Sequence, residues 1–203
     1  MSDINKNHWD TVYETKNPNE VSWTQEKPQT SLDLIRSAGL GKDARIIDIG
    51  GGDSNLVDFL LDEGYQNITI LDISAKALEK AKIRLGSKAE KVKWIVSDIT
   101  EFKPEENYDI WHDRAAFHFL TSPEQVSKYV DIAEKNIKGF LIVGTFSKNG
   151  PEKCSGLEIR QYDSDSLSEV FEPAFGRIKC LTEDHTTPFG TVQNFVFCSF
   201  KKN

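Results

Sequence analysis

The feature that most restricts how this chain can fold is an alternation, from residue 45 onward, of short β-rich segments with longer helical ones. The β-rich segments are nearly continuous apolar runs, and the segments between them have the apolar spacing of amphipathic helices. Neighbouring parallel strands need crossovers of this length, and strands covered on both faces read as continuous apolar runs. The alternation therefore predicts an α/β protein whose parallel sheet has helices on both faces. The expected strands are RIIDIG (45–50), NITILDIS (67–74), VKWIVSD (92–98), YDIWHD (108–113) and GFLIVGTFS (139–147).

The segment after residue 147 has a different pattern. It begins with a loop containing Gly, Pro and Ser (148–158), followed by a short helix near 164–171 and two further β-rich runs, RIKCLTEDH and TVQNFVFCSFK. The turn TPFG (187–190) joins these runs, and so short a connection makes them antiparallel. The expected sheet therefore has five parallel strands and a C-terminal antiparallel hairpin that contains one reversed strand.

Composition and charge exclude several classes of function. The 203 residues are 38% hydrophobic and 28% charged, which is ordinary for one soluble domain and excludes global disorder. The 25 basic and 32 acidic side chains give a net charge of −7, which opposes nonspecific binding to nucleic acid or anionic lipid. We therefore expect neither nucleic acid nor a membrane as a partner.

Cysteine usage and the N-terminal residues bear on location. Cys154, Cys180 and Cys198 form no CxxC pair and cannot all be paired, so we expect neither a disulfide framework nor a structural zinc site. The opening MSDINKNHWD lacks an apolar signal core, and no apolar run reaches the length of a membrane helix. These observations predict a cytoplasmic protein in a reducing setting, without a metal site.

A glycine-rich loop and three strand-end acids are the sharpest functional signal. Asp48-Ile-Gly50-Gly51-Gly52 ends the first strand, where glycines allow a tight turn and close approach of a ligand. Asp72 ends the second strand, where an acid in such folds accepts hydrogen bonds from ribose hydroxyls, and Asp98 ends the third. The alternative is purely structural, with the glycines making a turn and the acids capping helices or loops. The combination favours a ribose-bearing ligand at the C-terminal edge of the sheet.

The loop also bears on which ligand this is. A dinucleotide fingerprint needs a third glycine where this chain has Asn55, and Asp48 would repel the phosphates of such a ligand. A ligand with a positive charge near Asp48 fits better.

At this point the chain resembles the class I methyltransferases that depend on S-adenosylmethionine. DIGGGDS is similar to their glycine motif, Asp72 to their ribose acid, and Ser97-Asp98-Ile99 to the segment that contacts adenine. The C-terminal hairpin matches their Rossmann-like, seven-stranded, mostly parallel sheet. The resemblance covers about residues 40–203 and departs from the family at Ser54, where the loop often has its last glycine.

The resemblance implies a role for each matched residue. Asp72 would hold the ribose hydroxyls, Ile73 would pack against adenine, Asp98 would accept from its exocyclic amine, and Asp48 and Gly50 would serve the methionine end. Residues 1–44 would form a cap or lid, 45–147 the cofactor-binding half, and 148–203 a substrate-side loop, helix and hairpin of a single domain. The expected cofactor-binding residues are Trp23, Asp48, Gly50, Gly51, Gly52, Asp72, Ile73, Asp98 and Ile99.

The end of the fourth strand is expected to face the methyl acceptor. The segment DRAAFHFL (113–120) resembles the DRxAxxxL stretch of thiopurine and related small-molecule methyltransferases, and no NPPY or DPPY motif of base or glutamine methylation occurs there. The opening HWDTVY and EVSW resemble the start of several small methyltransferases, which act on small molecules or on protein lysine. In these relatives the opening segment folds over the cofactor, so we interpret Trp23 and Tyr13 as a lid; anchoring on the sheet is the alternative interpretation.

Catalytic candidates are the titratable residues near this edge. Histidine can accept a proton at neutral pH, which makes His112, His118 and His185 candidate bases. Alternation along the fourth strand would turn His112 into the sheet packing, and Asp113 is expected to face the pocket. For the histidines the alternative is a structural role. Cys154 lies in a loop that we interpret as a specificity element.

The sequence therefore predicts methyl transfer from S-adenosylmethionine to a small molecule, with protein lysine as the alternative acceptor. A nicotinamide-dependent oxidoreductase of the short-chain type would need a YxxxK pair, which the sequence lacks. A non-catalytic cofactor-binding domain is the remaining alternative. The oligomeric state does not follow from the sequence.

Overall fold

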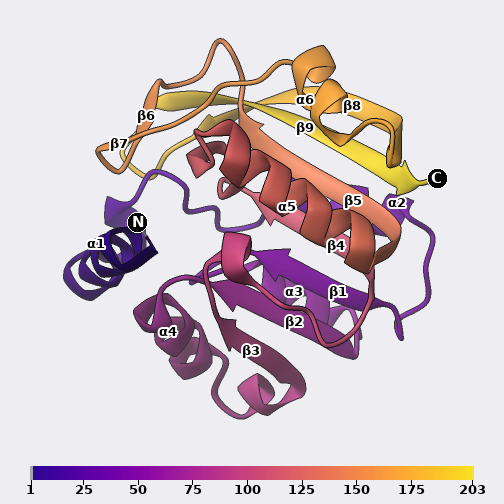
Figure 1. Ribbon diagram of the computed structural model, residues 1–203. Coiled ribbons are helices and arrows are strands. Elements are labelled where there is room, and N and C mark those ends of the chain that lie inside the picture. The colour runs from indigo at the N-terminus through magenta and orange to yellow at the C-terminus, as the bar shows by residue number, and fades with distance from the viewer. Residues whose placement is uncertain (1) are drawn as a thin grey trace.

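The computed structural model describes residues 2–203, with side chains from Asn5 onward, and its central feature is one seven-stranded sheet. The strands of this sheet are β1 (Arg45–Ile49), β2 (Asn67–Asp72), β3 (Val92–Val96), β4 (Tyr108–Arg114), β5 (Ile137–Phe146), β8 (Phe175–Thr186) and β9 (Val192–Lys202). Their order is β3-β2-β1-β4-β5-β9-β8 (Figure 1). β1 to β5 are parallel, whereas β9 runs antiparallel to both β5 and β8. The predicted sheet and C-terminal hairpin are confirmed.

Helices cover both faces of the sheet, as the continuous apolar strands predict. The α-helices are α1 (Ser2–Thr15), α2 (Gln29–Ser37), α3 (Leu56–Asp62), α4 (Ala75–Leu85), α5 (Pro123–Asn136) and α6 (Ser164–Phe171). One hydrophobic core contains side chains of α5 and α6 with one face of the strands, and the second contains side chains of α2, α3 and α4 with the other face. Figure 1 shows α5 in front of the sheet and α3 behind it.

Local sequence explains where several helices begin and end. The Ser74 hydroxyl accepts from the Ala77 N–H at 3.2 Å and caps α4, and Gly86, at φ +56°, follows its last residue. Ser122 and Gln125 form a capping box at the start of α5. These boundaries therefore lie at residues that are typical of helix caps.

Two regions contain more regular structure than predicted. The first 15 residues include the helix α1, whereas the sequence suggested only a cap or lid over residues 1–44. The loop after β5 contains a short hairpin of β6 (Lys153–Cys154) and β7 (Leu157–Glu158). Both are short or polar segments whose structure depends on contacts elsewhere in the chain. Short 3₁₀ turns complete the elements at Pro18–Glu20, Gly86–Lys91, Ile99–Glu101 and Phe117–Phe119.

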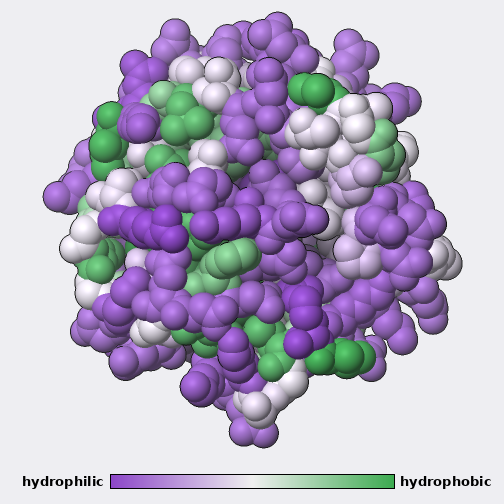
Figure 2. Space-filling model, turned by 180° about the vertical axis from the view of Figure 1, so that it is seen from behind, coloured by the Kyte–Doolittle hydropathy of each residue, from purple (hydrophilic) through white to green (hydrophobic). Residues whose placement is uncertain are grey.

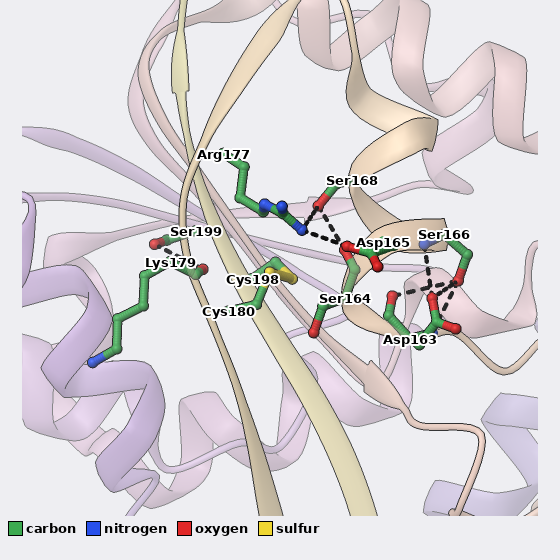
Figure 3. Close-up of a disulfide and its surroundings, with 10 residues drawn as sticks. All are labelled: Asp163, Ser164, Asp165, Ser166, Ser168, Arg177, Lys179, Cys180, Cys198 and Ser199. Carbon is green, nitrogen blue, oxygen red and sulfur yellow. Dashed lines mark hydrogen bonds and ion pairs between the residues drawn. A yellow bond between two sulfur atoms is a disulfide. The ribbon is translucent and has the colours of Figure 1, made fainter.

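The cysteines correct one expectation. Cys180 of β8 and Cys198 of β9 form a disulfide (Figure 3). Cys154 is free and buried. The two bonded residues stand directly opposite each other in the antiparallel pair, with Cα atoms 4.2 Å apart. Strand register, which the cysteine spacing does not reveal, brings them together. The expectation that excluded disulfide bonding is therefore wrong for this pair, and the reducing setting no longer follows from cysteine usage.

The face opposite that of Figure 1 is mostly hydrophilic, with small separate hydrophobic areas (Figure 2). None of the helices described is both long enough and apolar enough to cross a membrane.

Candidate functional site

The glycine loop turns sharply at the C-terminal end of β1. Gly50 and Gly52 have φ of +66° and +38°, a region that side chains with a Cβ rarely adopt. The Gly50 N–H donates to the Leu71 carbonyl at 2.7 Å, which ties the loop to the end of β2. Two strand ends are thus joined at the edge where the sequence places the ligand.

The loop also leaves space that only glycine provides. A Cβ at Gly51 would lie 2.6 Å from Asp48 Oδ2 and 2.8 Å from Ile70 Cγ2, and a Cβ at Gly52 would lie 2.8 Å from Asp72 Oδ2. These short distances show that the backbone lies against both carboxylates. The loop thus places its main chain beside the carboxylates of Asp48 and Asp72.

A first cavity of about 130 Å³ lies over the ends of β2 and β3. Asp72 and Asp98 line it together with the apolar side chains of Ile73 and Ile99, so it combines hydrogen-bond acceptors with apolar walls. The Asp98 Oδ1 accepts from Thr100 N–H and Oγ1 at 2.8 Å each, so the turn at Ile99–Glu101 holds this acid in place. The structure thus brings the four residues together around one cavity.

Asp72 is the buried acid of this cavity. Its Oδ1 accepts from the Ser74 N–H at 2.8 Å. Burial raises the pKa of Asp72 to about 7, with hydrogen bonding from Ser74 opposing the rise and the charge of Asp48 adding to it. A buried carboxylate without a cationic partner is stabilised by the hydrogen-bond donors that a ligand supplies.

A second cavity of about 360 Å³ adjoins the glycine loop on the side of β1 and β4. Asp48, His112 and Ser31 line it and form a buried chain: His112 Nδ1 lies 2.7 Å from Asp48 Oδ1, and His112 Nε2 lies 2.8 Å from Ser31 Oγ. Because a carboxylate only accepts, the His112 proton is on Nδ1 in this pair. This chain of hydrogen bonds fixes Oδ1 of Asp48, while Oδ2 of the same carboxylate lies close to Gly51. The two cavities share Tyr13, Trp23, Gly50 and Arg114.

Aromatic side chains from the N-terminal segment cover the cavities. Trp9 and Trp23 are 5.6 Å apart between ring centroids, Tyr13 and Trp23 are 6.2 Å apart, and Trp9 contacts Phe119 at 5.1 Å. Trp9, Tyr13, Trp23 and Phe119 all line the first cavity. The arrangement fits the predicted lid, with Trp9 and Phe119 added to it.

Polar contacts hold the segment 21–26, which we name the strap, over the site. Arg114 Nη1 donates to the Trp23 carbonyl at 2.9 Å, His185 Nε2 lies 2.7 Å from the Ser22 carbonyl, and Gln25 Nε2 donates to Glu183 Oε1 at 3.1 Å. The strap is therefore bound to β4 and to the C-terminal hairpin.

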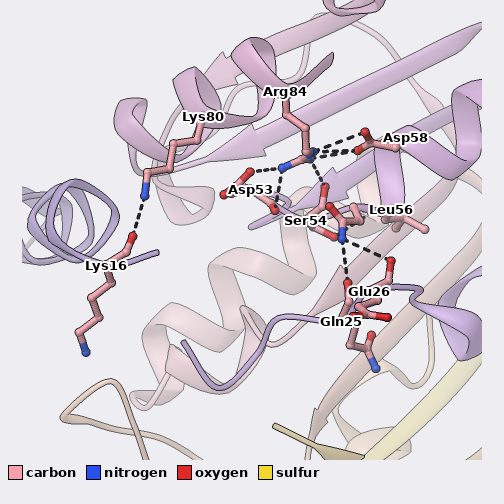
Figure 4. A network of polar contacts seen from close by, with 10 residues as sticks. Lys16, Gln25, Glu26, Asp53, Ser54, Leu56, Asp58, Lys80 and Arg84 are labelled. Atoms are coloured by element: carbon pink, nitrogen blue, oxygen red, sulfur yellow. Dashed lines mark hydrogen bonds and ion pairs between the residues drawn. The ribbon is translucent and has the colours of Figure 1, made fainter. Parts of the chain in front are cut away.

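A second group of polar contacts braces the glycine loop. Arg84 of α4 bonds Asp53, Asp58 and the Ser54 carbonyl, and Lys80 donates to the Lys16 carbonyl at 2.6 Å (Figure 4). On the other side, Asn55 Nδ2 donates to the Gln25 carbonyl at 3.0 Å. The loop, α4 and the strap thus form one connected rim.

Asp113, a predicted catalytic residue, lies inside the protein. Its Oδ1 accepts from the N–H groups of Ala116 and Phe117 at 3.2 and 2.9 Å, and its Oδ2 accepts from Tyr129 Oη at 3.0 Å. Burial raises the pKa of Asp113 to about 7. Asp113 does not line either cavity, and its contacts shape the turn after β4.

The two predicted histidines also lie outside the cavity linings. His118 stacks on Phe146 with centroids 4.7 Å apart, and burial, with the charge of Arg114, lowers its pKa to about 3. His185 holds the strap, and burial followed by the charge of Arg114 lowers its pKa as well. Cys154 lines the first cavity, where burial raises the pKa of its thiol to about 12.

Arg114 and Ser31 are the site residues whose positions the sequence did not reveal. Arg114 follows Asp113 in the predicted acceptor segment, but its role in both cavities depends on the strap and the C-terminal hairpin. Ser31 is in an amphipathic helix, and no local pattern separates it from an ordinary helix residue.

Comparison with known proteins gives matches to one family. Residues 46–136 match a model described as a methyltransferase domain. A malonyl-[acyl-carrier protein] O-methyltransferase 2 of Ilyobacter polytropus is 30% identical over 105 residues, which is 51% of this chain and 40% of that protein. The mouse eEF1A lysine and N-terminal methyltransferase is 31% identical over 85 residues, which is 41% of this chain and 12% of that protein. The chain thus spans less than half of either curated relative.

Similarity at the level of structure extends over nearly the whole chain. The N-methyltransferase NodS of Bradyrhizobium japonicum, solved with S-adenosylhomocysteine, superposes with a TM-score of 0.72 at 15% identity and covers 95% of this chain and 97% of its own. At this identity the similarity concerns the fold.

Proposed function

Because the chain belongs to the class I S-adenosylmethionine-dependent methyltransferases, we propose that it transfers the methyl group of this cofactor to a small-molecule acceptor. The cofactor supplies an electrophilic methyl group on a sulfonium, and the protein has to align an acceptor with it and exclude water. The proposal rests on the two joined cavities, the acids around them and the cation described below.

The residues present fit this cofactor. We assign Asp72 to the ribose hydroxyls and the pair of Asp98 and Ile99 to adenine, with Ile73 on the adenine as well, since these side chains combine around the first cavity. Asp48 and the backbone of Gly50 and Gly51 would hold the methionine end, where a positively charged amino group suits a carboxylate. The close approach of the backbone at Gly51 and Gly52 to both acids leaves no room for a Cβ. Trp23 would cover the bound cofactor and exclude water.

The observation that carries the choice of acceptor is the charge of Arg114. The Arg114 side chain lines both cavities and its guanidinium is buried, and among the described residues of the first cavity it is the one cation. A buried cation disfavours the ammonium group of a lysine substrate beside it. An uncharged or anionic small molecule meets no such repulsion.

Protein lysine is the second candidate because of the aromatic lid. The cluster of Trp9, Tyr13, Trp23 and Phe119 presents ring faces of the kind that attract cations. The relatives include both kinds of name, a malonyl-[acyl-carrier protein] O-methyltransferase and an eEF1A lysine and N-terminal methyltransferase. Since Arg114 shares the cavity with the rings, we rank lysine second.

The proposal is tested in two steps. Calorimetric titration with S-adenosylmethionine, S-adenosylhomocysteine and NADH should give binding of the first two only. Methyl-labelled cofactor is then incubated with the protein and either the low-molecular-weight or the protein fraction of a cell extract. We expect label in the low-molecular-weight fraction, and none when an Asp72→Ala variant replaces the wild type. Label on lysine of a protein would support the second candidate, and binding of NADH alone would contradict both.

The chain from Ser31 through His112 to Asp48 gives a prediction about cofactor binding. His112→Leu removes the donor that fixes Asp48 Oδ1, so we expect S-adenosylhomocysteine to bind about 5- to 30-fold more weakly, which corresponds to ~1–2 kcal/mol for one hydrogen bond to a charged group. His112→Asn keeps an N–H near the position of Nδ1 and should restore most of the affinity.

A second ligand separates this positioning role from a general loss of structure. 5′-Methylthioadenosine has the adenosine part but no amino-acid part, so its affinity should change less than twofold in His112→Leu. Calorimetry with both ligands measures the ratio. Equal weakening of both ligands would show that the hydrogen bonds of His112 support the fold of the site and do not act through Asp48.

A further inference from the structure

Arg114 has one half of its guanidinium fixed by hydrogen bonding and the other half without a partner. Nη1 donates to the Trp23 carbonyl at 2.9 Å, and the guanidinium lies over the Phe195 ring at 5.0 Å from its centroid. These contacts fix the plane of the group, where the strap, β4 and β9 meet. The side chain is therefore oriented before any ligand binds.

The half without a partner is the edge that carries Nε and Nη2. Both nitrogens are buried, and neither has a hydrogen-bond partner. Buried donors of a charged group are costly to leave unpaired, so a partner is expected at this edge. The Nε–Nη2 edge of an arginine presents two parallel N–H groups, the arrangement that binds a carboxylate through both oxygens.

Nearby acids do not occupy this edge. The charge of Glu183 acts to raise the pKa of Arg114. The Glu183 Oε1 accepts from Gln25 Nε2, and its Oε2 has no hydrogen-bond partner, so among the described residues Glu183 does not pair with Arg114. Asp48 is bonded to His112. Burial lowers the pKa of Arg114 to about 10, so the group still carries its charge at neutral pH.

We propose that the Nε–Nη2 edge of Arg114 binds a carboxylate of the methyl acceptor, which makes the acceptor a small organic acid. This inference rests on the proposed function and specifies its substrate class. The groups that contact Arg114 come from the strap and β9, and Glu183 of β8 and Cys154 are close to it. Asp48, which we assign to the cofactor, also acts on the charge of Arg114, so the site of the acceptor adjoins that of the cofactor. The cofactor's own methionine carboxylate is the other possible source of the same chemistry, and the experiment separates the two.

The probes are benzoate and benzamide, which share a ring and differ in the carboxylate. Protein saturated with S-adenosylhomocysteine is titrated with each by ligand-observed NMR. We expect benzoate to bind at least tenfold more tightly than benzamide, and Arg114→Gln to remove this difference. Arg114→Lys keeps the charge but not the two-donor edge, so it should lose most of the preference. Arg177→Gln, a matched change at an exposed arginine of β8 paired with Asp165, should have no effect.

A second variant tests the charge argument. Glu183→Gln removes the nearby negative charge while keeping the shape, so benzoate should bind several-fold more tightly to it. Unchanged benzoate affinity in Glu183→Gln, or equal binding of benzoate and benzamide by the wild type, would overturn the proposal.

The source of the carboxylate is read from cofactor binding. If Arg114→Gln weakens S-adenosylhomocysteine tenfold or more and leaves 5′-methylthioadenosine unchanged, the edge holds the cofactor's carboxylate and the assignment to the acceptor is wrong. We expect instead that any weakening in Arg114→Gln, which also loses the contact of Nη1 with the strap, is the same for both ligands within twofold. Failure of the wild type to bind S-adenosylhomocysteine at all would contradict the proposed function itself, a different result from failure of benzoate alone.

Discussion

Asp72→Asn is expected to weaken binding of S-adenosylhomocysteine by about 10- to 100-fold at pH 8. An ionised carboxylate accepts strongly from two ribose hydroxyls, whereas an amide offers one weaker acceptor, and the loss corresponds to ~1.5–3 kcal/mol. Because burial raises the pKa of Asp72 to about 7, wild-type affinity should rise with pH through neutrality as this carboxyl ionises. The variant has no such group and should show no pH dependence from this source.

The same substitution should stabilise the protein in the absence of ligand. The folded protein holds the Asp72 proton more tightly than the unfolded chain, so this group lowers the free energy of unfolding as pH rises from its ordinary pKa of 3.8 to about 7. At pH 8 the penalty is fully present, and removing it should raise the free energy of unfolding by about 2–4 kcal/mol. At pH 5 the gain should shrink to about half of that or less.

Urea unfolding at pH 5 and pH 8, with calorimetry of S-adenosylhomocysteine at both, measures these changes. Asp62→Asn is the control, since Asp62 is exposed and pairs with Lys88 on the surface. A variant that binds the ligand as well as the wild type would remove Asp72 from the cofactor site. A stability loss at pH 8 would show that the carboxylate is held more favourably than its burial implies.

The sheet and its covering helices were predictable because their signals are local. Continuous apolar runs mark β1 to β5, and caps such as Ser74 and Ser122 mark helix starts. The glycine loop and Asp72 were predictable for the same reason, since each lies at a strand end that the apolar pattern defines. The polar helix α1 has no apolar run of comparable length, and it was missed.

The remaining features depend on residues that are far apart in the sequence. The disulfide requires the register of β8 and β9, and the strap is fixed by His185 and Glu183, more than 150 residues away. The orientation of side chains on β4 also decides function, because His112 and Arg114 face the cavities while Asp113, between them, points to the opposite face and into the other core. Alternation along the strand was anticipated, but the prediction that Asp113 faces the pocket and His112 the sheet packing is wrong, because the local pattern does not show which face holds the site.

Asp113→Ala is expected to lower the free energy of unfolding by about 3–5 kcal/mol. The substitution leaves the N–H groups of Ala116 and Phe117 and the hydroxyl of Tyr129 without their acceptor, in a region shielded from water. Urea unfolding measures the change. Tyr129→Phe removes one member of this network and should cost about 1–2 kcal/mol.

Asp113→Asn distinguishes a structural role from the catalytic one that the sequence suggested. The amide keeps an acceptor for the two N–H groups, but its NH2 cannot accept from the Tyr129 hydroxyl, which already accepts from Trp111 Nε1 at 2.9 Å, so stability should fall by about 1–2 kcal/mol. If Asp113 only shapes the turn that carries Phe117 and Ala116, methyl transfer by this variant should remain within about threefold of the wild type, a change of ~0.7 kcal/mol in the barrier. Loss of methyl transfer by 100-fold or more, with stability and S-adenosylhomocysteine binding intact, would instead place the carboxylate in the chemistry. That result would require Asp113 to reach the cavity by a movement of the turn, because its two oxygens are both occupied by donors in this arrangement.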